Sequence, residues 1–239
     1  MNPAWLAGHS VQIERVRRLS GEYRAIRKGY LKSGVPTPMP QAAGAFLDDQ
    51  QTDRRWRLKA ATAEAHTRVE DQLAVAGMLS SPEGYRRYLE ATFEIRSAIE
   101  REMDLAHAVR IMPLWPERKI APLVAMDIMD VGGWVQAPKS VDDAPADQSI
   151  EAILGVLYVL EGSSLGARVV LKQVEALGMS HQHGARHLSA QAGDNKAWRQ
   201  LTSILQHDPM SALGEAACIR AAQQTFERFG DAYRRHGVK

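Results

Sequence analysis

The chain has 239 residues, a formal net charge of +2 and 24% charged residues. This length fits one sizeable domain with an appendage, and the near-neutral charge excludes the strongly basic footprint of a nucleic-acid-binding domain. The single cysteine, Cys218, excludes an internal disulfide framework and a cysteine-rich metal site. A reducing, cytoplasmic setting is therefore expected.

The sequence also predicts no membrane span. Its most hydrophobic stretch, Ile153–Leu160, has 8 residues, whereas a spanning helix needs roughly 20. The first residues, MNPAWLAGHS, lack the charged-then-apolar order of a secretory signal. We therefore expect the protein to remain in the compartment where it is made.

Residues 1–50 are expected to form a basic N-terminal extension and a Pro-rich linker. Seven basic side chains lie between positions 15 and 32, against one acid, Glu22. Three prolines, Pro36, Pro38 and Pro40, then prevent a helix, because each removes a backbone donor and restricts φ. The basic segment is interpreted either as a short helix before a flexible linker or as a dock for a redox partner or an anionic surface.

Residues 51–239 show the hydrophobic period of helices and no alternating strand pattern, so the predicted fold class is all-α. In the first helix, Leu58, Ala61, Ala65 and Val69 recur at spacings of three and four. Ser81-Pro82-Glu83 has the cap, proline and early acid of a helix start. Later helices are predicted over Ile150–Leu177, ended by Gly178, and over Asn195–Leu205 and Ser211–Arg235.

Two regions are predicted to be loops. One surrounds a short helix and contains Pro113, Pro116 and Pro122. The other spans Gln136–Gln148 and is rich in Asp, Pro and Ser. The segment HQHGARH, with His181, His183 and His187, is also interpreted as a solvated loop rather than a metal site.

The first segment with candidate functional residues is residues 58–70, LKAATAEAHTRVE. His66 lies in mid-helix, and Lys59 lies seven residues earlier, on nearly the same face and roughly 10 Å away along the axis. One face thus offers an imidazole for a metal and an ammonium for a carboxylate, while Glu70 could orient the imidazole. A lone helical histidine is more often a structural or surface residue, so spacing alone leaves both interpretations open.

The second segment is residues 157–172, LYVLEGSSLGARVVLK, within the long predicted helix. Gly162 and Gly166 are four residues apart and share a face, although each glycine costs about 1 kcal/mol relative to alanine. They could permit close packing against another helix, or they could let the backbone lie against a flat ligand. Ser163 and Ser164 add hydroxyls that could hold water beside that face.

These two segments resemble the haem oxygenase family. Residues 58–70 are similar to the proximal helix, with its Leu-Lys-x-Ala-Thr-x-x-x-His-Thr run, and residues 161–172 to the distal helix of the bacterial branch, with Glu-Gly-Ser-x-Leu-Gly-Ala. The resemblance extends over residues 52–236 and does not cover the first 50. It implies a helical bundle in which haem is sandwiched between a proximal and a kinked distal helix.

The resemblance also implies roles for individual residues in haem binding. His66 would be the axial ligand of the haem iron, and Lys59 would contact a propionate. Arg199 would be a second basic propionate contact, and Tyr158 would face the haem edge.

On the distal side, the resemblance makes Gly162, Ser163 and Gly166 the catalytic positions. The two glycines would kink the helix and bring its backbone near the bound O2. Ser163 stands where animal members carry a carboxylate that organises water, so other groups must hold that water here.

The implied reaction is O2-dependent oxidative cleavage of haem, which is both substrate and cofactor, to biliverdin, CO and iron. The chain has no flavin or nicotinamide motif, so electrons must come from an external donor, a ferredoxin or a flavoprotein reductase. A biliverdin acceptor such as a bacteriophytochrome is a further expected partner.

Two alternatives share this scaffold. Thiamin-salvage and cofactor-maturation oxidases bind no haem and would not need His66 and the paired glycines at these positions. A non-catalytic haem-binding carrier or sensor would keep His66 but would not turn haem over.

Overall fold

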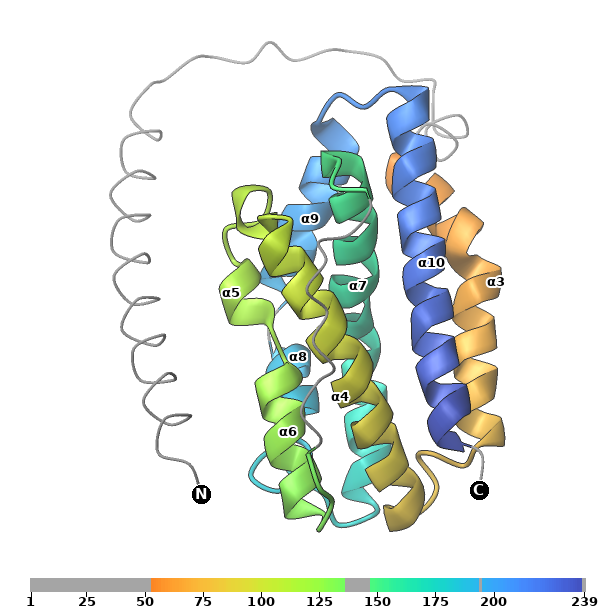
Figure 1. Ribbon diagram of the computed structural model, residues 1–239, viewed down its shortest axis with the longest axis vertical. Coiled ribbons are helices and arrows are strands. Elements are labelled where there is room, and N and C mark those ends of the chain that lie inside the picture. Colours follow the sequence, from red (N-terminus) through yellow and green to blue (C-terminus); the bar gives the residue numbers. More distant parts are fainter. Residues whose placement is uncertain (1–52, 136–146, 194, 238–239) are drawn as a thin grey trace, which may run out of the picture. The chain divides into compact units, whose positions relative to one another are not determined.

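The structure is a computed structural model that describes residues 53–135, 147–193 and 195–237 (Figure 1). These residues form α3 (Arg54–Val75), α4 (Pro82–Leu105), the 3-10 turn η1 (Ala108–Arg110), α5 (Trp115–Arg118), α6 (Ala121–Asp130), α7 (Ile150–Glu175), α8 (Arg186–Gly193), α9 (Lys196–His207) and α10 (Ala212–Gly237). The described part of the chain contains no strand, which confirms the predicted all-α class. The N-terminal extension and most of the predicted loop 136–148 lie outside the described residues.

The helix starts follow local sequence signals. Ser81 caps α4, where its side chain accepts a hydrogen bond from the Gly84 N–H and Pro82 opens the helix. Ser149 caps α7 in the same way, through the Ala152 N–H. Gly178 adopts a φ of +89° just beyond the end of α7, a conformation that glycine takes without strain. The predicted start of α4 is thus confirmed, and the predicted limits of α7 are confirmed to within two residues.

The core lies where α10 packs along α7, α3 and α4. In Figure 1, α3, α7 and α10 run in the same direction and α4 runs in the opposite one. Gly155 lets α7 approach α10 closely, because a Cβ atom added there would lie 2.2 Å from the carbonyl oxygen of Cys218. Close packing between these two helices therefore requires a glycine at position 155.

The proline-containing region was predicted incorrectly, because it holds more helix than expected. Pro116 and Pro122 lie in the first turns of α5 and α6, where a missing N–H leaves no helical hydrogen bond unmade. These prolines therefore start helices. The prediction also missed α8, which begins at Arg186 inside the segment assigned to a solvated loop.

Helix α7 differs from its prediction in one further respect. By length and composition it could cross a membrane, since an 18-residue window within it has a mean hydropathy of 1.5. Half of that window is buried inside the fold, and the core helix of a soluble protein meets the same criterion. The uninterrupted apolar run of eight residues, Ile153–Leu160, is therefore only part of the apolar stretch of α7.

Candidate functional site

His66 projects from α3 with 57% of its side chain exposed, so it is not a structural histidine of the core. Its ring packs edge-on against Phe226 of α10, with ring centroids 5.6 Å apart. Its Nδ1 lies 3.5 Å from a carboxylate oxygen of Glu70, one turn further along α3. These two contacts orient the ring and leave Nε2 as the nitrogen for a ligand.

Lys59 lies two turns before His66 and is also exposed. Its ammonium is 4.7 Å from the ring centroid of Trp56, and the guanidinium of Arg55 lies over the same ring at 5.3 Å. Contacts of this kind favour a cation over an aromatic face. The start of α3 therefore presents positive charge on the side of the helix near His66.

Thr62 and Tyr158 connect α3 to α7. Burial raises the pKa of the Tyr158 phenol, and the neighbouring Thr62 hydroxyl opposes that shift. Because the two helices run in the same direction (Figure 1), the next turn after this contact carries His66 on α3 and Gly162 on α7. The proximal and distal motifs thus come to the same region of the fold.

One face of α7 beyond this contact is open and apolar. It carries Gly162, Leu165, Gly166 and Val169, whose spacing of three and four places them together. Leu165 and Val169 are 54% and 63% exposed, and a Cβ at Gly166 would meet nothing within 4 Å. Helix packing in the described residues therefore does not account for Gly166, whereas it does account for Gly155.

The two predicted glycines differ from each other. A Cβ at Gly162 would lie 3.5 Å from the ring of Trp198 on α9, an ordinary van der Waals distance. The Trp198 ring also contacts Tyr158, with centroids 5.6 Å apart. An aromatic wall formed by Tyr158 and Trp198 thus borders one end of the open face, and α7 continues as one helix through both glycines.

Ser163 makes two defined hydrogen bonds. Its Oγ donates to the Leu160 carbonyl at 2.7 Å and accepts from Nε2 of Gln191, on α8, at 3.0 Å. Arg199 is exposed on α9, beside Trp198, and its guanidinium makes no hydrogen bond or ion pair with another described residue. Arg199 is therefore available to an anion, and Ser163 is already engaged with α8.

Other residues of the second motif are structural. Glu161 is buried and pairs with Arg118 of α5, Nε to Oε2, at 2.9 Å. Ser164 is also buried, and its hydroxyl donates to the Glu161 carbonyl at 2.6 Å. These contacts join α5 to α7 immediately beside the glycine pair.

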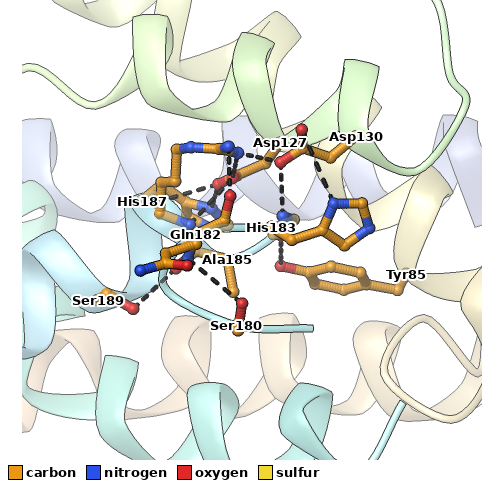
Figure 2. Close-up of polar contacts among 11 residues, drawn as sticks. Tyr85, Asp127, Asp130, Ser180, Gln182, His183, Ala185, His187 and Ser189 are labelled. Carbon is orange, nitrogen blue, oxygen red and sulfur yellow. Dashed lines mark hydrogen bonds and ion pairs between the residues drawn. The ribbon is translucent and has the colours of Figure 1, made fainter. Parts of the chain in front are cut away.

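Sequence reasoning missed a polar cluster between α6 and α8 (Figure 2). His187 was predicted to lie in a solvated loop, and this was wrong: its side chain is fully buried, and Nδ1 lies 2.7 Å from Oδ2 of Asp127. Burial lowers the pKa of His187 although Asp127 opposes that shift, so the ring is neutral. The sequence around His187 gives little indication of this pair, because the two partners are 60 residues apart.

No group of three or more His, Cys, Asp or Glu side chains is arranged to hold a metal ion in the parts of the chain that the structure describes. A single imidazole such as that of His66 is sufficient when a macrocycle occupies the other coordination positions of the metal, as in many haem proteins.

Comparisons with known proteins point to one family. A family model described as Heme oxygenase matches residues 129–235. The chain is 29% identical over 188 residues to Heme oxygenase PigA of Pseudomonas aeruginosa, which covers 78% of this chain and 94% of that protein. It is 30% identical over 115 residues to a heme oxygenase of Xanthomonas campestris pv. campestris, covering 48% of this chain and 67% of that one.

Solved structures show the same fold. The NO- and CO-bound haem oxygenase of Neisseria meningitidis superposes with a TM-score of 0.66 and 26% identity, covering 78% of this chain and 92% of that chain. The haem oxygenase of Leptospira interrogans, at 16% identity, has a TM-score of 0.59 over 77% of this chain and 99% of that one, and supports the fold alone. Taken with the two motifs on α3 and α7, these matches show that the chain belongs to the haem oxygenase family.

Proposed function

We propose that this haem oxygenase binds haem between α3 and α7, with Nε2 of His66 as the axial ligand of the iron. The observation that carries the proposal is the exposed imidazole of His66, which is oriented from behind by Glu70 and Phe226. A metal-binding histidine commonly donates its other ring N–H to a carboxylate, which selects the tautomer and orients the ring.

The remaining residues fit a flat, largely apolar group with two carboxylates. The open face of α7, with Leu165, Gly166 and Val169, would lie against the macrocycle. Lys59 and Arg199 are exposed cations that would bind the propionates. Each exposed ion pair of this type contributes roughly 0.2–1 kcal/mol, so the two cations would orient haem more than they would hold it.

Each side chain then has a distinct task in the reaction, in which haem is cleaved with O2 and external electrons to biliverdin, CO and iron. When bound, haem supplies the oxygen chemistry. His66 would hold the iron through its imidazole nitrogen. Gly162 and Gly166 would leave the α7 backbone accessible to a bound haem, while the Tyr158 and Trp198 rings would limit the access of water from one side.

We further propose that the electrons come from a ferredoxin or a flavoprotein reductase in the cytoplasm, because the chain carries no flavin or nicotinamide motif. A biliverdin acceptor such as a bacteriophytochrome would take the product. In this proposal residues 51–239 form the catalytic domain, and the basic extension of residues 1–50 lies outside it. No observation favours the haem carrier or the haem-free oxidase over this function.

Titration of the purified protein with hemin, followed by ascorbate under air, tests the proposal. We expect a Soret band that saturates at one haem per chain, and then biliverdin absorbance as that band decays. A Soret band without biliverdin would support the carrier, and no Soret band would support the haem-free oxidase.

A further inference from the structure

Helix α8 contacts α7 on both sides of Gly166. Nε2 of Gln191 donates to Oγ of Ser163 at 3.0 Å, and Nε of Arg168 donates to the Ala192 carbonyl at 3.0 Å. Ser163 and Arg168 flank the segment that contains Gly166, and Gln191 and Ala192 are neighbours on α8. Two hydrogen bonds thus tie a short stretch of α8 to the part of α7 that contains Gly166.

This segment needs outside support. Glycine gives the backbone more freedom than any other residue, and the open face of α7 has no neighbouring side chain at Gly166 to restrain it. Gln191 is buried, at 8% exposure, and Ser163 is exposed, so their hydrogen bond is partly shielded from competing water.

The other end of α8 is held firmly by α6 (Figure 2). Asp127 accepts hydrogen bonds from the backbone N–H groups of Arg186 and His187 at 2.9 and 3.0 Å, and its Oδ2 also contacts the His187 ring. Asp130 accepts from the Gly184 N–H at 2.7 Å and pairs with the Arg186 guanidinium. Carboxylates at a helix N-terminus accept hydrogen bonds from its free N–H groups and interact favourably with the positive end of the helix dipole. Helix α8 is therefore anchored at its start and attached to α7 near its end.

We propose that α8 is a brace for the distal helix and that Gln191 is a positioning residue for haem cleavage. It acts through Ser163 and does not contact the haem. Resting on the proposed function, in which α7 covers the haem, the brace fixes the α7 backbone over one part of the macrocycle and so contributes to the selection of the carbon that is attacked.

The test compares Gln191→Leu with Gln224→Leu, an identical change at an exposed position of α10. Hydrogen exchange of the haem-free protein is measured over residues 162–168. Loss of one typical hydrogen bond corresponds to a roughly 2- to 10-fold faster exchange, and we expect this in Gln191→Leu only. Haem affinity should stay within a few-fold of wild type, because Gln191 acts through Ser163, whereas the ratio of biliverdin isomers should broaden.

Ser163→Ala removes the same hydrogen bond from an exposed position and provides a second test should Gln191→Leu fail to fold. In the double variant the effects should not add, because both changes remove one interaction. Unchanged exchange over residues 162–168 in either single variant that folds would overturn the brace. Absence of biliverdin from the wild-type protein would instead overturn the proposed function, and the exchange comparison would still decide on the brace.

Discussion

Replacing Gly166 with leucine separates the two explanations for the glycines of α7. A Cβ atom at this position would meet no atom within 4 Å on the open face of α7. Leucine favours a helix over glycine by about 0.8 kcal/mol. For a domain of 150–250 residues, about 1 kcal/mol corresponds to a change of roughly 2–4 °C in Tm. The haem-free Gly166→Leu protein should therefore melt about 2–3 °C higher than wild type.

The same substitution should lower the rate of haem cleavage, although it stabilises the protein. The leucine side chain would occupy the space beside the reacting centre, and misplacement by about 1 Å can lower a rate about 100-fold. Ferric haem should still bind through His66 within a few-fold of the wild-type affinity. Biliverdin formation should fall by about 100-fold.

Gly155→Ala is the matched comparison on the same helix. Its Cβ would lie 2.2 Å from the Cys218 carbonyl oxygen, so α7 and α10 must separate, and overpacking of this kind costs about 1–3 kcal/mol. We expect a lower Tm for Gly155→Ala. Thermal melts of haem-free protein, hemin titrations and ascorbate-driven turnover measure the three effects. Full turnover by a stabilised Gly166→Leu protein would refute the assignment of the distal face.

Three further outcomes are expected. Lys59→Glu should weaken haem binding by roughly 2- to 10-fold and mix the biliverdin isomers, because a propionate would meet a like charge. Lys59→Arg keeps the positive charge and should have neither effect. Equal haem affinity and isomer ratio in the two variants would remove Lys59 from the site. Burial lowers the pKa of His187, so its contribution to stability is complete above about pH 6.5 and declines as the pH falls below that value. Urea unfolding measures this between pH 7 and pH 5. The free energy of unfolding of His187→Gln should depend less on pH than that of wild type. An equal pH dependence in the two proteins would contradict the buried neutral ring. Burial raises the pKa of the Cys218 thiol to about 12, so a thiol reagent at pH 8 should modify it only in denaturant, and rapid labelling of the native protein would disprove its burial.

Features encoded by neighbouring residues could be predicted from the sequence. The start of α4 depends on Ser81 and Pro82, and the end of α7 on Gly178, all within one turn of the boundaries that they set. The motif on α3 is equally local, since Lys59 and His66 share one helix face. Their joint use in binding haem stays a prediction.

Features that depend on distant partners could not be predicted. Whether Gly155 or Gly166 permits helix packing depends on what lies opposite, and only the fold shows Cys218 near one and open space near the other. His187 resembled a loop residue because its partner, Asp127, lies 60 residues earlier in the chain. The hydrogen bond from Gln191 to Ser163 is non-local in the same way.

The central claim is that His66 holds the haem iron, and substitution by alanine tests it most directly. The side chain is largely exposed and alanine is the better helix former, so His66→Ala should keep its helix content and its Tm. On hemin titration followed by ascorbate, we predict loss of the wild-type Soret band and of biliverdin formation, with partial recovery of the band when imidazole is added. A folded His66→Ala protein with the wild-type Soret band and turnover would contradict the account.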